Sequence, residues 1–490
     1  MRAAIVGAGF SGIATAIALK REGVEEITIF ERAGDVGGVW FHNTYPGACC
    51  DVPSYVYSFS YEQRRDWSRP CSPQEEIHQY LRGVVRKYGL AGMLRFDTEV
   101  TDAAFDEGAQ VWRLRTAAGD EHEAELLVVA CGQLSRPRTP SIPGAEDFAG
   151  HAFHSAAWDH GYDLRGRRVA VIGTGASAVQ FVPEIAQEVA HLDVYQRTAP
   201  YMLPRRNPTY PGWLRALIRH VPGVQAARRI AMWLFMESLT FGLTRFRPAL
   251  ASARLWSATF MRMQVRDPEL RRRIRPDYPF GCKRILFSSN YLPALQRPNV
   301  DLVTDRIARI SERGVVTEDG REREADCIIY GTGFRADEFV LPMEVTGRGG
   351  VELQQAWAAG AEAHLGITIA GFPNMFLLYG PNTNLGAGSI VMMIEAQAGY
   401  VAQAVRALRE SGAGALDLRP EVQAASGAEV QERLRETVWV ECQSWYRRDG
   451  TGRVTNNWPG LVTEYLRATR RLELADYELL PARSPDFAIP

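Results

Sequence analysis

The stretch AAIVGAGFSG at residues 3–12 decides the fold of this chain. An apolar run enters the pattern G-x-G-x-x-G, which is typical of a buried strand that turns into a helix and binds a dinucleotide. Gly7 permits the tight turn, Gly9 lets the backbone approach a pyrophosphate, and Gly12 allows the helix to pack closely on the strand. The N–H groups and dipole of the helix N-terminus then attract the phosphates.

The residues that follow agree with this interpretation. Residues 13–19 have helical spacing, and residues 26–30 are apolar and β-branched enough to form the next strand. Glu31 stands at the end of that strand, where a carboxylate accepts hydrogen bonds from ribose hydroxyls. We therefore predict an α/β, Rossmann-like domain at the start of the chain.

A second copy of the pattern, RVAVIGTGASA, occupies residues 168–178. Its glycines are Gly173 and Gly175, Ser177 precedes the expected helix, and Ala178 is the third small residue. We predict a second dinucleotide loop here.

The strand after the second loop differs in charge from its counterpart. Residues 192–195 lead into Gln196, Arg197 and Thr198, with no acid at the strand end. Because Arg197 can pair with a 2′-phosphate and Thr198 can donate to it, the second site should prefer NADPH to NADH. The alternative is that Arg197 is a solvated surface charge.

Two such loops indicate a two-dinucleotide flavoprotein, with FAD at the first loop and NADPH at the second. We predict an α/β fold with two Rossmann-like domains, joined at the glycine turn of residues 326–334 and the proline-rich residues 136–144. The expected division is FAD-binding at 1–140 and 331–490, NADP-binding at 148–206 and 278–330, and a helical insertion at 207–277.

Two longer motifs point to one family. Residues 148–159 read FAGHAFHSAAWD, which fits F-x-G-x-x-x-H-x-x-x-W-D, and residues 37–51 read GGVWFHNTYPGACCD, which fits G-G-x-W-x-x-x-x-Y-P-G-x-x-x-D. Together they resemble the type I Baeyer-Villiger monooxygenases, which are class B flavoprotein monooxygenases. His154 and Trp158 of the first motif are expected to be packing residues, while Trp40 of the second is expected at the flavin.

The resemblance implies an enzyme that uses NADPH and O2 to insert one oxygen atom beside a ketone carbonyl through a C4a-peroxyflavin. The product would be an ester or a lactone. Two alternatives stay open: a flavin monooxygenase that oxygenates sulfur or nitrogen, and an NADPH-flavin oxidase or binding flavoprotein that transfers no oxygen.

The same resemblance suggests which residues perform the chemistry. Arg284, at the end of YPFGCKR (residues 278–284), would supply a fixed cation near the flavin. Asp51 would orient Arg284, Lys283 would reach the 2′-phosphate beside Arg197, and Trp445 would close over nicotinamide and substrate. A plain ion pair between domains is the alternative for Arg284 and Asp51.

Composition narrows the possible partners. A formal net charge of -1 gives no electrostatic reason to expect nucleic acid, and no residue set suggests a metal. The seven cysteines include no C-x-x-C pair, so we expect reduced thiols in a cytoplasmic protein. No apolar run approaches the length of about 20 residues that a membrane span needs. We also expect no signal peptide, because a glycine loop follows the short apolar stretch at residues 3–6 at once. The sequence does not indicate an oligomeric state.

The insertion alternates apolar residues with arginines. We expect helices with one apolar and one basic face that cap the NADP-binding region and line the approach of the substrate. A peripheral membrane contact is the alternative, because arginines on a cap and arginines at a lipid surface have the same pattern.

Overall fold

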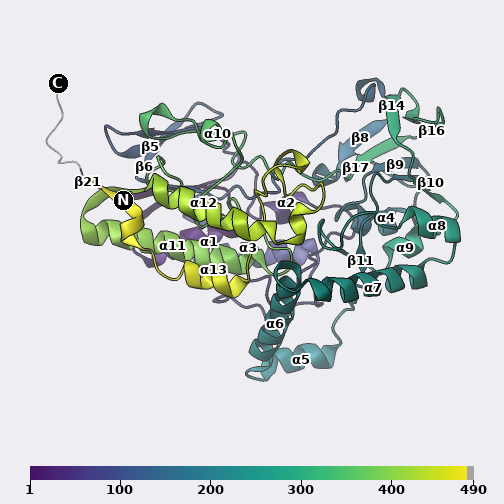
Figure 1. Cartoon of the computed structure of the whole chain (residues 1–490), viewed down its shortest axis with the longest axis horizontal. Helices are drawn as coiled ribbons and strands as arrows, with labels where there is room; N and C mark the ends of the chain where they lie inside the picture. Colours follow the sequence, from purple (N-terminus) through teal and green to yellow (C-terminus); the bar gives the residue numbers. More distant parts are fainter. Residues whose placement is uncertain (483–490) are drawn as a thin grey trace.

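The computed structural model describes residues 1–482, apart from the side chain of Arg247. Residues 483–490, which the sequence assigns to the FAD-binding region, lie outside the described residues. The molecule is elongated, and the strands β8, β9, β10 and β17 gather at one end of it, away from β5 and β6 (Figure 1).

The first parallel sheet has the order β19-β7-β1-β2-β3. Its strands are β1 (Arg2–Val6), β2 (Glu26–Phe30), β3 (Leu94–Arg95), β7 (Leu126–Val129) and β19 (Met375–Leu377). Helices α1 (Phe10–Arg21), α3 (Gln74–Lys87) and α11 (Ile390–Ser411) contribute to the same hydrophobic core. The sheet therefore joins residues from both ends of the chain.

The second parallel sheet has the order β13-β10-β9-β17-β8. Its strands are β8 (His151–His154), β9 (Arg168–Ile172), β10 (His191–Tyr195), β13 (Val300–Val303) and β17 (Cys327–Tyr330). Helices α4 (Ala178–Ile185) and α9 (Tyr291–Ala294) pack with it in a second core. Each of β1 and β9 lies inside its sheet and ends at a glycine loop, which is where α/β sheets bind ligands.

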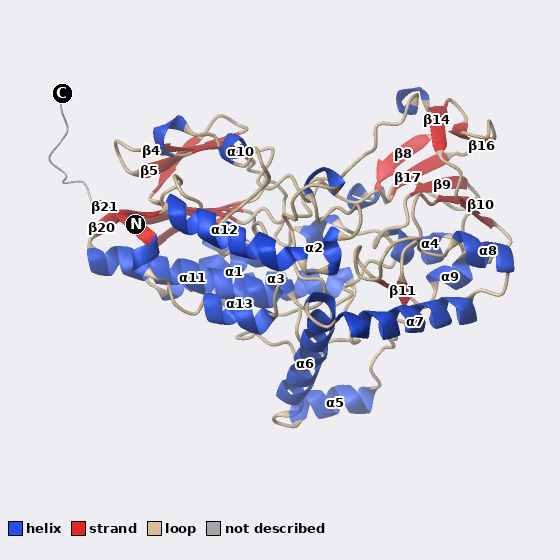
Figure 2. Ribbon diagram, viewed as in Figure 1, coloured by secondary structure: helices blue, strands red, loops and turns tan. Residues whose placement is uncertain are grey.

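Smaller elements complete the two lobes (Figure 2). A four-stranded sheet has the order β18-β4-β5-β6, and a three-stranded sheet the order β14-β15-β16. These strands are β4 (Val100–Asp106), β5 (Val111–Thr116), β6 (Glu121–Ala124), β18 (Glu344–Thr346), β14 (Ile307–Ser311), β15 (Gly314–Thr317) and β16 (Glu322–Glu324). The two-stranded sheets pair β11 (Met202–Leu203) with β12 (Leu286–Phe287) and β20 (Ala413–Leu418) with β21 (Tyr477–Pro481). The remaining α-helices outside the insertion are α2 (Val39–His42), α10 (Leu353–Ala356), α12 (Pro420–Arg435) and α13 (Val462–Ala468).

The insertion folds into four helices, which are α5 (Gly212–His220), α6 (Val224–Thr244), α7 (Arg247–Gln264) and α8 (Pro268–Arg273). Helices α5 and α6 project from the lower edge of the molecule in Figure 1. Helix α7 contacts β11 and α9, so it packs on the lobe that contains the second sheet.

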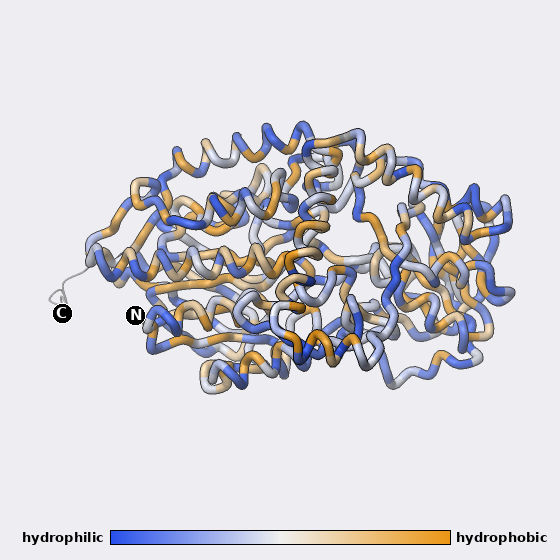
Figure 3. The backbone as a smooth tube through the Cα atoms, turned by 90° about the horizontal axis from the view of Figure 1, so that it is seen from below, coloured by the Kyte–Doolittle hydropathy of each residue, from blue (hydrophilic) through white to orange (hydrophobic). Residues whose placement is uncertain are grey.

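The predicted fold class is confirmed. The helix expected from residue 13 runs over Phe10–Arg21, and the strand expected at residues 26–30 is β2. Within the described residues, no helix is both long and apolar enough to cross a membrane. Hydrophobic and hydrophilic residues instead alternate along the helices (Figure 3).

The expectation of reduced thiols is wrong for two of the seven cysteines. Cys282 and Cys442 form a disulfide whose Cα atoms are 6.2 Å apart and whose partners are separated by 160 residues. No short spacing could reveal this pair, because it joins the loop before Arg284 to the loop before Trp445 only in the folded chain.

Candidate active site

A single cavity of 2490 Å³ extends between the two lobes. Both glycine loops line it, and so do residues from α6 and α7. Among the predicted site residues, those that line the cavity are Gly7, Gly9, Glu31, Trp40, Asp51, Gly173, Gly175, Ser177, Arg197, Thr198, Lys283, Arg284 and Trp445. Gly12 and Ala178 lie behind the loops in the packing.

The first glycine loop is shaped by three close approaches. Gly7 has φ +108°, and a Cβ there would lie 2.6 Å from the carbonyl oxygen of Ala130. A Cβ at Gly12 would lie 1.9 Å from the carbonyl oxygen of Gly7, so helix α1 can start only with glycine at both positions. At Gly9 the nearest atom would be 3.8 Å away, which leaves the cavity side of the loop open to a bulky ligand.

Two features make this loop suitable for a pyrophosphate and a ribose. Helix α1 has no side-chain cap and no acid in its first turn, so its N–H groups remain available to an anion. Glu31 is buried at the end of β2 and accepts from the backbone N–H groups of Ala8 at 2.8 Å and Ala33 at 2.9 Å. Its carboxylate is thereby fixed beside the loop while it still lines the cavity.

The second loop repeats this design. Gly173 has φ +112°, and a Cβ there would lie 2.4 Å from the carbonyl oxygen of Gly331. A Cβ at Gly175 would meet nothing closer than 3.8 Å. Ser177 is the N-cap residue of α4 without a side-chain cap bond, and Ala178 is fully buried where the helix meets the sheet.

Two cations converge beside the second loop. Burial and the neighbouring positive charge of Arg197 lower the pKa of Lys283 below its ordinary value. The charge of Asp277 opposes this effect on Lys283 more weakly, and no ion pair of either cation occurs among the described residues. Lys283 Nζ lies 4.6 Å from the ring centre of Tyr278. Thr198 lines the cavity next to Arg197. Two unpaired cations with a hydroxyl beside them fit the three oxygens of a phosphate.

The predicted ion pair between the lobes is present. Arg284 Nη2 donates to Asp51 Oδ2 at 2.5 Å, although 233 residues separate them in sequence. The charge of Asp51 raises the pKa of Arg284 above its ordinary value. Burial raises the pKa of the Asp51 carboxyl, but Arg284 and then Arg205 more than offset it, so the pKa lies below the usual value. The pair is therefore fully ionised at neutral pH and faces the cavity.

Arg205 was missed in the sequence. Its guanidinium donates to Cys49 Sγ at 2.7 Å and to the carbonyl oxygen of Cys50 at 2.9 Å, so it holds the loop that carries Asp51. The sequence gives no signal for this role, since Arg205 follows the second lobe's strand β11 and looks like one of many surface arginines. Its partners Cys49 and Cys50 are 156 and 155 residues away in the chain.

Two aromatic residues named in the sequence, Trp40 and Trp445, border the cavity. Trp40 Nε1 donates to the hydroxyl of Tyr57 at 3.1 Å, which fixes the indole at the first loop. Trp445 is half-buried against Tyr446, with 4.3 Å between ring centres. The disulfide from Cys282 to Cys442 ties the Trp445 loop to the segment that carries Arg284.

The residues of the first family motif are structural, as expected. His154 Nδ1 accepts from the backbone N–H of Ala156 at 3.0 Å, and burial lowers the pKa of the imidazole. The indole of Trp158 packs against Phe153 and Phe181 in the second core. These contacts shape the connection between the lobes.

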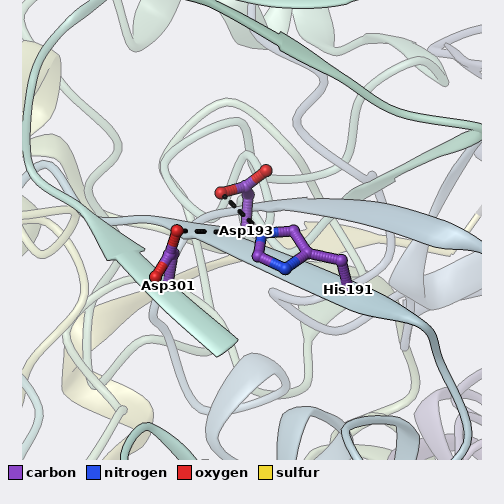
Figure 4. Close-up of side chains that lie close together, drawn as sticks. All are labelled: His191, Asp193 and Asp301. Atoms are coloured by element: carbon purple, nitrogen blue, oxygen red, sulfur yellow. Dashed lines mark ion pairs between the residues drawn. The ribbon is translucent and has the colours of Figure 1, made fainter. Parts of the chain in front are cut away.

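One group of potential metal ligands lies outside the cavity. His191 faces Asp193 and Asp301 on neighbouring strands β10 and β13 (Figure 4). Arg323 also donates to Asp193 at 2.8 Å and to Asp301 at 3.2 Å. Because a guanidinium already contacts both carboxylates, we assign no metal to this group.

Comparison with known proteins extends over almost the whole chain. The family described as pyridine nucleotide-disulphide oxidoreductase matches residues 4–222. A protein of Streptomyces coelicolor named Baeyer-Villiger monooxygenase is 44% identical over 98% of this chain and 93% of its own length. A protein of the same name from Pseudomonas aeruginosa is 42% identical over 98% of this chain and 91% of its own length.

Solved structures give the same picture. An oxidised steroid monooxygenase bound to NADP is 33% identical, with a TM-score of 0.87 over 98% of this chain and 99% of that one. A complex of OTEMO with FAD and NADP is 27% identical, with a TM-score of 0.86 over 98% and 99% of the two chains. The likeness therefore includes both lobes.

Proposed function

Since the chain belongs to the Baeyer-Villiger monooxygenase family, we propose that it converts a ketone into an ester or lactone with NADPH and O2. FAD is the bound cofactor, and NADPH is the reductant. The observation that carries this proposal is the single cavity in which two dinucleotide loops meet the Arg284–Asp51 pair. A binding protein would have no need for a fixed cation where the loops converge.

The two loops are assigned by what lies beside them. The loop at Gly7 to Gly12 binds FAD, with Glu31 on the ribose and Trp40 near the ring system. When bound, FAD would supply the chemistry that accepts a hydride from NADPH and activates O2. Helix α11 supports the flavin side, because its N-terminal residue Ile390 lines the cavity and its first turn contains no acid.

Arg284 has the role of compensating charge. Attack on a ketone places negative charge on the carbonyl oxygen, and a guanidinium held beside it stabilises that charge. Asp51 keeps Arg284 oriented, and Arg205 holds the loop of Asp51 in place. We therefore treat Arg284 as the catalytic residue and Asp51 as its positioning partner.

The second loop, with Gly173, Gly175, Ser177 and Ala178, binds NADPH. Arg197, Thr198 and Lys283 hold the 2′-phosphate, and Trp445 closes over the nicotinamide side of the cavity. The domain boundaries predicted from the sequence belong to the same proposal. We also place the enzyme in the cytoplasm, where NADPH is produced.

The substrate is a small ketone with apolar bulk. Beyond the two loops, the cavity is lined by Leu239 and Leu243 of α6 and by Leu250 and Ala253 of α7. Such a lining excludes water and suits hydrocarbon around a single polar carbonyl.

The experiment is a panel of aryl, cyclic and fused polycyclic ketones, with a sulfide and an amine included. We expect ketone-stimulated NADPH oxidation and a product heavier by one oxygen atom that derives from labelled O2. Oxygen transfer to the sulfide or amine alone would make the protein a heteroatom oxygenase. NADPH oxidation that yields only hydrogen peroxide, with every ketone recovered, would refute oxygen insertion.

A further inference from the structure

Helix α6 exposes its apolar residues and turns its charged residues inward. The exposed residues of this helix are Ala226, Ala227, Ile230, Ala231, Leu234, Phe235, Ser238 and Phe241. Ile230 is 54% exposed, Leu234 55% and Phe235 57%. A helix on the surface of a water-soluble domain has the opposite arrangement.

The charged residues of α6 are all engaged with the body of the protein. Arg228 Nη2 donates to the hydroxyl of Tyr210 at 3.1 Å. Arg229 donates to the carbonyl oxygens of Tyr55 and Ser58, and burial lowers its pKa. Glu237 accepts from the backbone of Val462 at 3.2 Å and of Thr463 at 3.0 Å. None of the charged residues of α6 therefore lies on its outer face.

The apolar surface continues onto the neighbouring helices. Eleven of the sixteen exposed large hydrophobic side chains in the described part of the chain lie between residues 213 and 263. Those outside α6 are Trp213, Leu217, Val221, Phe246, Leu255, Trp256 and Met263. Helices α5 and α7 both contact α6, so this exposed apolar area is concentrated in one part of the fold, which is typical of an interaction site.

The flanks of this surface are basic. Residues 212–264 contain eight arginines and one acid, Glu237, in a chain whose net charge is -1. Three of these arginines are already engaged: Arg228 and Arg229 as described above, and Arg245 in an ion pair with Glu464. Arg215 and Arg219 of α5 and Arg254 and Arg262 of α7 are exposed. The surface therefore combines apolar side chains with unopposed positive charge, and its partner must be anionic and able to receive hydrocarbon.

We propose that the outer surface of α5, α6 and α7 docks on an anionic lipid bilayer. The apolar face of α6 would enter the boundary between headgroups and acyl chains, and the arginines would contact lipid phosphates. A symmetric pair of two copies is disfavoured, because it would oppose the same basic flanks to each other. In Figures 1 and 2, α5 and α6 project beyond the rest of the molecule, so a flat surface can reach them.

This docking is independent of the reaction proposed above, and its test uses no turnover. The FAD-loaded full chain is sedimented with vesicles of phosphatidylglycerol and phosphatidylcholine in equal parts, and with vesicles of phosphatidylcholine alone. We expect binding to the first and much weaker binding to the second, with a decline as salt is added. The yellow colour of the pellet reports folded holoenzyme.

Two sets of variants separate the apolar from the electrostatic contribution. Leu234→Ser with Phe235→Ser should weaken vesicle binding by at least about 10-fold, since both side chains would leave the hydrocarbon. Arg254→Gln and Arg262→Gln should each weaken it by about 5-fold. Neither pair lines the cavity, so the visible spectrum of bound FAD should be unchanged. The matched control is Leu474→Ser with Leu479→Ser, two residues that are each 42% exposed and lie outside the insertion.

Protein that stays in the supernatant with both vesicle types overturns the proposal. So does equal binding by the Leu234/Phe235 variant and its control, or equal binding to the two vesicle compositions. If size-exclusion chromatography instead shows a dimer that the Leu234/Phe235 variant loses, without vesicle binding, the surface is an interface between copies of the chain and the lipid assignment is wrong.

Discussion

The Arg284–Asp51 pair allows a quantitative test by a double-mutant cycle. The perturbations are Arg284→Ala, Asp51→Ala and the two combined. Removing a charge-stabilising donor from an active site costs about 100-fold or more in rate, so Arg284→Ala should lose at least that much oxygen transfer. FAD should still bind, because Gly7, Gly9 and Glu31 are untouched.

The contribution of Asp51 follows from its contact. A hydrogen bond between charged groups is worth about 1.5–3 kcal/mol net. The side chains of Arg284 and Asp51 are 37% and 23% exposed to the cavity, so we take about 2 kcal/mol after solvent screening, which corresponds to about 30-fold. If both residues acted separately, the double variant would lose about 3000-fold, but if Asp51 acts only through Arg284 it should lose about 100-fold.

The assay is a single turnover, in which enzyme reduced by NADPH is mixed with O2 and ketone and the ester is quantified. This measurement excludes product release and isolates the oxygenation step. Arg313→Ala removes an exposed ion pair with Glu322 far from the cavity and is the control. If the loss of rate in the double variant equals the product of the two single losses, Asp51 does not act through Arg284. Asp51 would then be a structural residue of the flavin loop.

Three further predictions test the coenzyme site, the disulfide and the ionisation of Asp51. Arg197→Ala should raise the KM for NADPH by about 10-fold or more, because one charge-assisted phosphate contact is lost, and should hardly change the KM for NADH. An unchanged coenzyme preference in steady-state kinetics would show that Arg197 does not belong to the coenzyme site. Cys442→Ser removes a disulfide that closes a loop of 160 residues. The loss of chain entropy in the unfolded state makes such a crosslink worth up to about 5 kcal/mol of stability, so the midpoint temperature of FAD release should fall. A midpoint equal to that of the oxidised wild type would contradict the disulfide. Because the folded pKa of Asp51 lies below its usual value, the ion pair's stabilisation is complete above the ordinary carboxyl range near about 4 and is lost as pH falls through the folded pKa. Acid titration of FAD release should therefore show a steeper loss for wild type than for Asp51→Asn, and parallel curves would disprove the linkage.

The sequence alone predicted those parts of the fold that a local pattern of residues determines. The loops at Gly7 and Gly173 require glycine because a carbonyl oxygen occupies the place of a Cβ, so their spacing is readable without a structure. Arg284 and Asp51 were paired from two motifs of one family, and the fold brings them to 2.5 Å. Their roles remain proposals, since contact alone does not reveal chemistry.

Contacts between distant segments could not be read in this way. Arg205 reaches Cys49 and Cys50 through a turn of the second lobe, and Cys282 meets Cys442 only because two loops close over the same cavity. The orientation of the inserted helices could not be predicted either. The alternation of arginines and apolar residues predicted amphipathic helices, but it did not predict that α6 would turn its arginines inward. Which face points outward depends on the partners available, here backbone carbonyl oxygens of Tyr55 and Ser58.

Lys283 and Arg284 are neighbours on one short segment, and this adjacency links the two halves of the enzyme. Lys283 lies near enough to Arg197 to feel its charge, and Arg284 donates to Asp51. If Lys283 holds the coenzyme phosphate as proposed, any shift of the backbone that follows this phosphate is transmitted to the guanidinium across a single peptide bond. Engineering a change from NADPH to NADH should therefore start at Arg197, on a separate strand end, since redesign at position 283 would alter the oxygen chemistry together with the coenzyme preference.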